Sequence, residues 1–112
     1  MKLLEKAERI RIYTGEDDKF EGRPMADAIV EKAREMGLAG ATVFRGLSGF
    51  GANSLIRTSR ILRLSEDLPV VVEIIDHPEQ LAPLLEVIDT MIQEGMVTRE
   101  PVDVIAYRHN GK

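Results

Sequence analysis

Apolar and polar positions alternate with a period of two in three segments of the chain, residues 8–14, 40–47 and 102–107. In the first of them, Ile10 and Ile12 fall on one face of an extended chain, and Arg9, Arg11 and Tyr13 fall on the other. A fourth segment, residues 70–75, is almost wholly apolar and β-branched, which is typical of a central strand. The pattern therefore predicts four strands, at least three of them half-buried.

Two other segments repeat their apolar residues at helical spacing. Pro24 stands where a first helical residue belongs, since the N–H that it lacks has no partner there, and Gly37 is a natural stop. Pro78 opens the second helix and Gly95 ends it. The two apolar stripes are Ala26, Ile29, Val30, Ala33 and Met36, and Leu81, Leu84, Leu85, Ile88, Met91 and Ile92.

Polar segments separate these elements. Residues 15–22, bounded by glycines, predict a loop before the first helix. Residues 47–63 are rich in Gly, Ser, Asn, Thr and Arg and predict a long excursion or an extended hairpin, whose far limb at 56–64 alternates weakly. Residues 108–112 form a short polar tail.

The resulting order is strand, helix, strand, strand, helix, strand. It predicts an α+β fold of the ferredoxin-like βαββαβ type, an antiparallel sheet with both helices on one face. The other sheet face must then meet solvent or a partner, and the strand at 70–75 places apolar residues on both faces. We therefore expect a homo-oligomer, for which three sheets around an axis is one good solution. The alternative is a monomer that covers this face with its own hairpin.

Composition narrows the classes of function. The 112 residues carry 15 Lys and Arg against 19 Asp and Glu, a net charge of −4, and the length fits a single domain over residues 1–112. The absence of cysteine excludes disulfides, thiol catalysis and Cys-type zinc sites. An acidic balance with few aromatic residues argues against nucleic acid. Since no apolar run approaches the roughly 20 residues that span a bilayer and no signal peptide is evident, we expect a cytoplasmic protein without membrane insertion.

The glycine-rich segment RGLSGFG, residues 45–51, is the richest candidate for binding. Gly46, Gly49 and Gly51 allow the backbone to approach a ligand, and successive N–H groups in such a loop hold anions. Arg45 and Arg57 would supply countercharge. The segment is neither a P-loop nor a dinucleotide fingerprint, and a hairpin whose glycines serve turns and bulges explains it equally well.

Other residues give weaker signals. The acidic run at residues 16–18 with Glu21 lacks the spacing of a calcium loop, so a solvated loop explains it better. His77 belongs to the start of the second helix and His109 to the tail, and neither has a spaced partner. We expect no metal site.

An acylphosphatase-like hydrolase is one alternative function, because small ferredoxin-like domains can host that chemistry. Arg23 would be its loop arginine and Asn53 would position water. The glycine-rich phosphate cradle that such chemistry needs before the first helix is missing, and nothing in the sequence designates a base that activates a hydroxyl nucleophile. We therefore expect no enzyme activity.

Three segments resemble blocks of a bacterial and archaeal family of uncharacterised PII-like signalling proteins. They are GEDDKFEGRPMADAIVEKARE at 15–35, GLAGATVFRGLSGFG at 37–51 and LSEDLPVVVEIIDHPE at 64–79. The resemblance covers nearly the whole chain. It implies a ferredoxin-like fold, a homotrimer and a regulatory role, with an adenine nucleotide (ADP, AMP or ATP) as effector. A genetic link of some members to fluoride-exporting channels implies a membrane channel or transporter as protein target.

The resemblance also implies a site. In PII proteins the loop between strands two and three contacts targets, and its root binds nucleotide in a cleft between subunits; here the loop is 47–63. PII proteins also present basic residues near the last strand to the phosphates. The residues that correspond are Arg45, Gly46, Gly49, Phe50 and Gly51 at the root, and Arg108 and His109 after the last strand.

One departure from PII changes the expected ligand. The glycine-rich phosphate loop of PII is replaced by residues 94–101, in which Gly95, Thr98 and Arg99 suit a phosphate. The ligand could therefore be a smaller nucleotide or another anion. The sequence favours a PII-like regulator of this kind, and its alternatives are the hydrolase and a purely structural interaction module.

Overall fold

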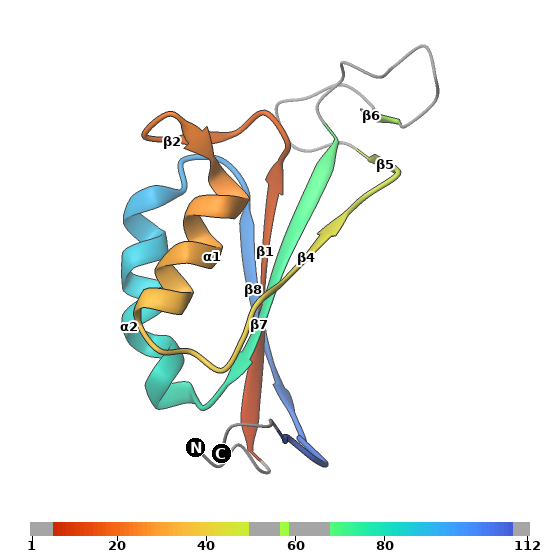
Figure 1. The fold of residues 1–112 in the computed structure, drawn as a ribbon. Helices are drawn as coiled ribbons and strands as arrows, with labels where there is room; N and C mark the ends of the chain where they lie inside the picture. The colour runs from red at the N-terminus through yellow and green to blue at the C-terminus, as the bar shows by residue number, and fades with distance from the viewer. Residues whose placement is uncertain (1–5, 50–56, 59–67, 109–112) are drawn as a thin grey trace.

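A computed structural model describes residues 6–49, 57–58 and 68–108 of the chain (Figure 1). Its elements are β1 (Ala7–Gly15), β2 (Lys19–Phe20), β3 (Arg23–Pro24), α1 (Met25–Glu35), β4 (Thr42–Arg45), β5 (Ser48–Gly49), β6 (Arg57–Thr58), β7 (Pro69–Asp76), α2 (Pro78–Met91) and β8 (Met96–Val102). Among these residues, no helix is long and apolar enough to cross a bilayer.

The four longer strands form one antiparallel sheet in the order β4-β7-β1-β8. Both helices lie together on one side of this sheet, and its other face is open (Figure 1). The central strand, β1, pairs with β7 on one side and β8 on the other. The predicted α+β, ferredoxin-like fold is therefore confirmed.

The core lies between the sheet and the helices. Ile10 and Ile12 of β1 are fully buried there, while Arg9, Arg11 and Tyr13 are half-buried on the open face, as their alternation predicts. The remaining core residues come from the other main elements: Met25, Ala26, Ala28, Ile29, Ala33, Val70, Val72, Ile74, Leu81, Leu84, Ile88 and Met91. Burial of these apolar side chains is the main favourable contribution to the stability of the fold.

The helix boundaries agree with the sequence to within a few residues. Pro24 is the extended N-cap of α1 rather than its first helical residue, and Gly37, at φ +78°, follows the C-cap as predicted. Pro78 opens α2 as expected, with His77 as its N-cap. That helix ends at Met91, before Gly95, so the predicted C-terminal boundary is wrong.

The last strand lies earlier in the chain than the alternation at 102–107 predicts. β8 pairs with β1 along its whole length, and residues 103–108 have no regular structure. Its sequence, MVTREPV, has the charges and the proline of a loop, but an edge strand tolerates both. Thr98 and Arg99, which the PII comparison places in a phosphate loop, therefore lie within a strand.

The polar segments contain short hairpins that the hydrophobic pattern missed. β2, within the loop predicted at 15–22, pairs with β3 just after it. In the same loop the Asp18 carboxylate accepts the Gly15 N–H at 2.9 Å. β5 pairs antiparallel with β6, so the described part of the connection between β4 and β7 is a hairpin. Most of the limb predicted at 56–64 lies outside the described residues.

Candidate functional site

A cavity of about 360 Å³ lies where the chain leaves the sheet for the β4–β7 connection. The end of β1, the start of α1, the end of β4 and the start of β7 line it, and we call it the loop-root cavity. Its volume falls at the lower end of the range for small-molecule sites. The cavity is therefore large enough for part of a nucleotide or for a smaller anion.

Arg45, the last residue of β4, is a predicted binding residue that lines this cavity. Its guanidinium forms an ion pair with Glu16, although 65% of the Arg45 side chain is exposed. Asp17 and Asp27 also line the cavity, so its lining contains three carboxylates and one guanidinium. An anion that binds Arg45 must therefore compete with the Glu16 carboxylate or share the guanidinium with it.

The presence of glycine at positions 46 and 49 is explained by packing within the fold, without a ligand. The Gly46 N–H donates to the Pro69 carbonyl at 2.8 Å, and a Cβ on Gly46 would lie 2.6 Å from Pro69 Cγ. A Cβ on Gly49, at φ +155°, would lie 3.2 Å from the same atom. Both glycines thus let the chain pass closely over the Pro69 ring.

Arg108, the other predicted binding residue with a charge in the described part of the chain, does not line this cavity. Arg108 is exposed beyond β8, beside Tyr107, whose hydroxyl donates to the Ala39 carbonyl at 3.3 Å. Ala39 precedes β4 and Arg45 ends it, so the two arginines lie toward opposite ends of the sheet (Figure 1). One protomer cannot present both to one small ligand. Three other predicted residues, Phe50, Gly51 and His109, lie outside the described residues.

The candidate hydrolase residues give that alternative little support. The exposed Arg23 guanidinium donates to Glu31 on α1 at 2.6 Å, and this hydrogen bond raises the pKa of Arg23. Asn53 lies outside the described residues. The loop arginine is thus engaged by a surface carboxylate of the following helix.

The residues weighed for metal binding have structural partners. His77 caps α2, and its carbonyl accepts the N–H groups of Gln80 and Leu81. In the acidic loop, the Asp18 carbonyl accepts the Met25 N–H at 2.8 Å, which ties the loop to the start of α1. Across the described ranges, no three His, Cys, Asp or Glu side chains are grouped to hold a metal ion.

The open sheet face carries a charged cluster. Glu73 receives a hydrogen bond from Arg11 at 3.0 Å and lies 3.8 Å from Arg9, and Arg9 also pairs with Glu100. The hydrogen bond to Glu73 raises the pKa of Arg11. The carboxylates thus partly neutralise the two arginines that the alternation places on this face.

Beside this cluster, an apolar row crosses all four strands of the open face. Its members are directly paired from strand to strand: Phe44, Val71, Tyr13 and Met96. Phe44 and Met96, at the two edges, are 50% and 54% exposed. Such a row, open to solvent in an isolated chain, is typical of an interface.

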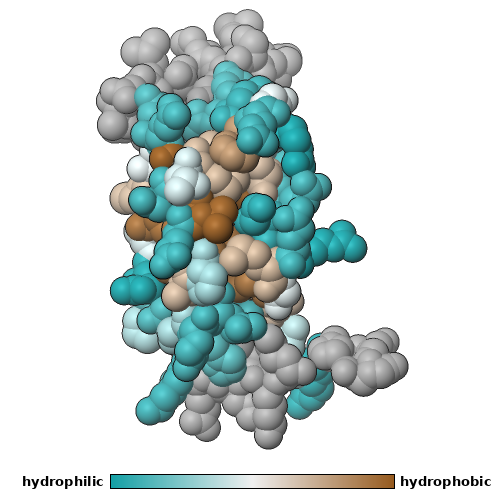
Figure 2. All heavy atoms as spheres, turned by 90° about the vertical axis from the view of Figure 1, so that its left-hand side faces the viewer, coloured by the Kyte–Doolittle hydropathy of each residue, from teal (hydrophilic) through white to brown (hydrophobic). Residues whose placement is uncertain are grey.

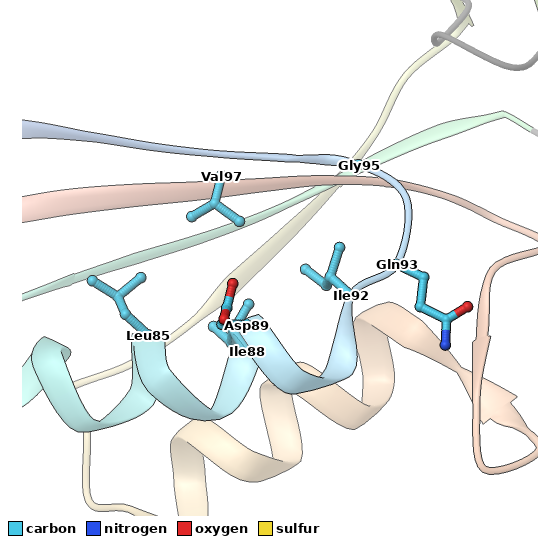
Figure 3. A pocket seen from close by; sticks show the side chains of 7 residues that line it. All are labelled: Leu85, Ile88, Asp89, Ile92, Gln93, Gly95 and Val97. Carbon is cyan, nitrogen blue, oxygen red and sulfur yellow. The ribbon is translucent and has the colours of Figure 1, made fainter.

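A second cavity, of about 390 Å³, lies between α2 and β8, and Figure 3 shows the side chains that line it. Leu85, Ile92 and Val97 supply apolar walls, and Asp89 adds a carboxylate. We call it the α2–β8 cavity. Sequence reasoning missed it because the segment that forms its far wall was interpreted as a loop.

The chain belongs to the DUF190 family, described as "Uncharacterized ACR, COG1993", whose profile matches residues 7–104. It is 45% identical over 100 residues to a UPF0166 protein of Aquifex aeolicus (strain VF5), covering 89% of this chain and 94% of that protein. A UPF0166 protein of Methanocaldococcus jannaschii is 39% identical over 80 residues, covering 71% and 73% of the two chains. The resemblance to an uncharacterised PII-like family is therefore confirmed.

Among solved structures, the chain is similar to CPII of Thiomonas intermedia K12, which was solved bound to ADP and bicarbonate. The TM-score is 0.63 and 90% of each chain is covered, at 18% sequence identity. This similarity shows that the chain has the fold of PII proteins.

Proposed function

We propose that this chain is a PII-type regulatory protein that binds a small anionic effector, an adenine nucleotide, at the loop-root cavity. The observation that carries the proposal is the position of Arg45, which ends β4 at the cavity from which the β4–β7 connection departs. CPII, which shares the fold, was solved with ADP and bicarbonate, and this supports a nucleotide as ligand. The proposed setting is the cytoplasm.

Binding would signal through competition for Arg45. A phosphate group would compete with Glu16 for the guanidinium, because Arg pairs bidentately with phosphate as it does with carboxylate. The Glu16 N–H donates at 2.8 Å to the carbonyl of Leu68, the last residue of the β4–β7 connection. A shift of the Glu16 backbone on release of its side chain would act on the far end of that connection through this hydrogen bond. The effector shifts the conformation only as far as its contacts differ between the two states.

A complete site would need a second subunit. Arg108 can reach an effector held by Arg45 only if another copy presents it, since the two lie toward opposite ends of the sheet within one protomer. We propose a homotrimer whose three open sheet faces pack around an axis and bury the apolar row. In that assembly each effector lies in a cleft between subunits.

Thermal unfolding with a panel of ligands tests the proposal. The panel is ADP, AMP and ATP with and without Mg²⁺, and phosphate, bicarbonate and fluoride. An effector at about 100 times its Kd adds about 2.7 kcal/mol of stability, which raises the Tm by about 10 °C in a domain of this size. Arg45→Gln should remove the shift. Arg23→Gln, which also breaks an exposed Arg–Glu pair, should keep it.

A panel without any shift would contradict effector binding, provided that isothermal calorimetry on the same samples also detects no heat. That result would favour the structural interaction module, which the packing of Gly46 and Gly49 against Pro69 already supports. An equal shift in wild type and Arg45→Gln would contradict only the assignment of the site.

A further inference from the structure

The loop-root cavity lies on the helical side of the sheet. Arg45 points to this side, because its partner in β7 is the buried Val70. Asp27, in the first turn of α1, lines the cavity from the helix. Figure 2 views the molecule from this side and shows apolar side chains gathered in the middle, with hydrophilic ones around them. Apolar side chains also line the cavity: Pro24, Ala26, Val43 and Val70.

The polar side chains of this lining are unequal in hydrogen-bond character. The Arg45 guanidinium only donates, whereas the three ionised carboxylates only accept. The phosphate group of an effector also accepts, so among these side chains it has a partner in Arg45 alone. A carboxylate that a ligand covers without a hydrogen bond destabilises the complex. The rest of the effector must therefore bring hydrogen-bond donors to the carboxylates.

Asp27 is the carboxylate that is available to such a donor. Glu16 is already in an ion pair, and Asp17 has a partner within the chain. In the described part of the chain, no hydrogen bond or ion pair engages the Asp27 carboxylate, and Arg23, just before the helix, donates to Glu31 instead. Asp27 is also exposed, so a ligand can reach it.

We propose that the loop-root cavity holds the ribose phosphate of the effector, with the phosphate on Arg45 and the two ribose hydroxyls on the Asp27 carboxylate. The inference rests on the function proposed above and adds the residue that sets its specificity. The two oxygens of a carboxylate can accept both hydroxyls of a vicinal diol, and an acidic residue binds the ribose in dinucleotide-binding folds. The site therefore selects ribonucleotides over deoxynucleotides.

Isothermal titration calorimetry with AMP and ADP, and with the 2′-deoxy and 3′-deoxy form of each, tests the proposal. In the wild type, loss of one hydroxyl should weaken binding about tenfold, the lower end for a hydrogen bond to a charged group. Asp27→Ala should bring the ribonucleotides and deoxynucleotides to nearly equal affinity. Its affinity for the deoxynucleotides should not fall, because the variant lacks the carboxylate that repels their phosphate groups.

Glu35→Ala is the matched control. Glu35 is an exposed acid at the end of the same helix, pairs with Lys32 and does not line the cavity. Both variants remove one negative charge, and both introduce a residue that favours a helix, which circular dichroism checks. In Glu35→Ala the preference for ribonucleotides should be unchanged.

Three results would overturn the inference and leave the proposed function intact. They are equal affinity of the wild type for ribonucleotides and deoxynucleotides, a ribonucleotide preference that Asp27→Ala retains, or an equal loss of that preference in Glu35→Ala. If Asp27→Ala changed only the ratio of the affinities for AMP and inosine monophosphate, Asp27 would contact the base and the ribose assignment would be wrong. Absence of binding by every nucleotide would contradict the proposed function itself, and this inference with it.

Discussion

Asp76, at the end of β7, has a fully buried carboxylate that holds two backbone segments together. Its oxygens accept the N–H of Ala39 at 2.8 Å and that of His77 at 2.7 Å. In Asp76→Asn, the amide group would face one of these donors, so we expect a loss of about 1–3 kcal/mol in the free energy of unfolding. Urea unfolding at fixed protomer concentration measures it. The exposed Asp103→Asn is the control, and equal urea midpoints would contradict the role of Asp76.

The close contact between Gly46 and Pro69 can also be tested by single substitutions. Gly46→Ala should cost about 1–3 kcal/mol, because its Cβ would lie 2.6 Å from Pro69 Cγ. Gly40→Ala should be nearly neutral, since nothing lies within 4 Å of its Cβ. In the double variant Gly46→Ala with Pro69→Ala, part of the lost free energy of unfolding should be recovered, and urea unfolding measures it. A double variant that is simply the sum of the two single ones would show that the contact does not limit this position.

Among the elements, β8 depends on the turn that delivers it from α2. Gly95 has φ +137°, and a Cβ there would lie 2.4 Å from the Tyr13 carbonyl oxygen, a backbone atom that cannot move aside. Gly37, after α1, has φ +78° but open space around its Cβ. Gly37→Ala should therefore cost only the conformational strain of about 1–2 kcal/mol. Gly95→Ala should cost more and should also separate β8 from β1.

Hydrogen exchange distinguishes these two glycine variants. In Gly95→Ala, the amides of β8 should exchange faster while those of the β1–β7 pairing keep their protection, because β8 is an edge strand. In Gly37→Ala, exchange should change near the end of α1 alone. Equal protection of β8 in the two variants would mean that the Gly95 turn does not set the position of this strand.

For the molecule as a whole, the open face predicts assembly. A homotrimer has three times the 12.5 kDa of one chain, or about 37.5 kDa, which light scattering after size exclusion measures directly. Val71→Asp puts a charge in the middle of the apolar row and should yield the monomer, because burying an unpaired carboxylate is costly. Ala82→Asp, on the exposed side of α2, should leave the mass unchanged. A wild-type mass of 12.5 kDa at all concentrations would contradict the trimer.

The sequence alone determined the elements whose signal is local. Alternation in β1 identified its buried and open faces, the apolar stripes identified both helices, and the order of elements gave the ferredoxin-like topology. For the site, the sequence selected Arg45 and the root of the β4–β7 connection, where a cavity is found. These features are predictable because periodicity and connectivity are properties of neighbouring residues.

Only the tertiary structure decided the features that depend on distant residues. β8 is a strand because it pairs with β1, more than 80 residues away in the chain, and its own composition is that of a loop. Glycine is needed at positions 46 and 49 because a Cβ there would crowd the Pro69 ring. The buried Asp76 carboxylate accepts the backbone N–H of Ala39, and Arg45 forms an ion pair with Glu16. Each of these contacts joins segments that the sequence separates, so no local pattern encodes it. The separation of Arg45 from Arg108 follows in the same way, because the length and direction of β4 place them toward opposite ends of the sheet.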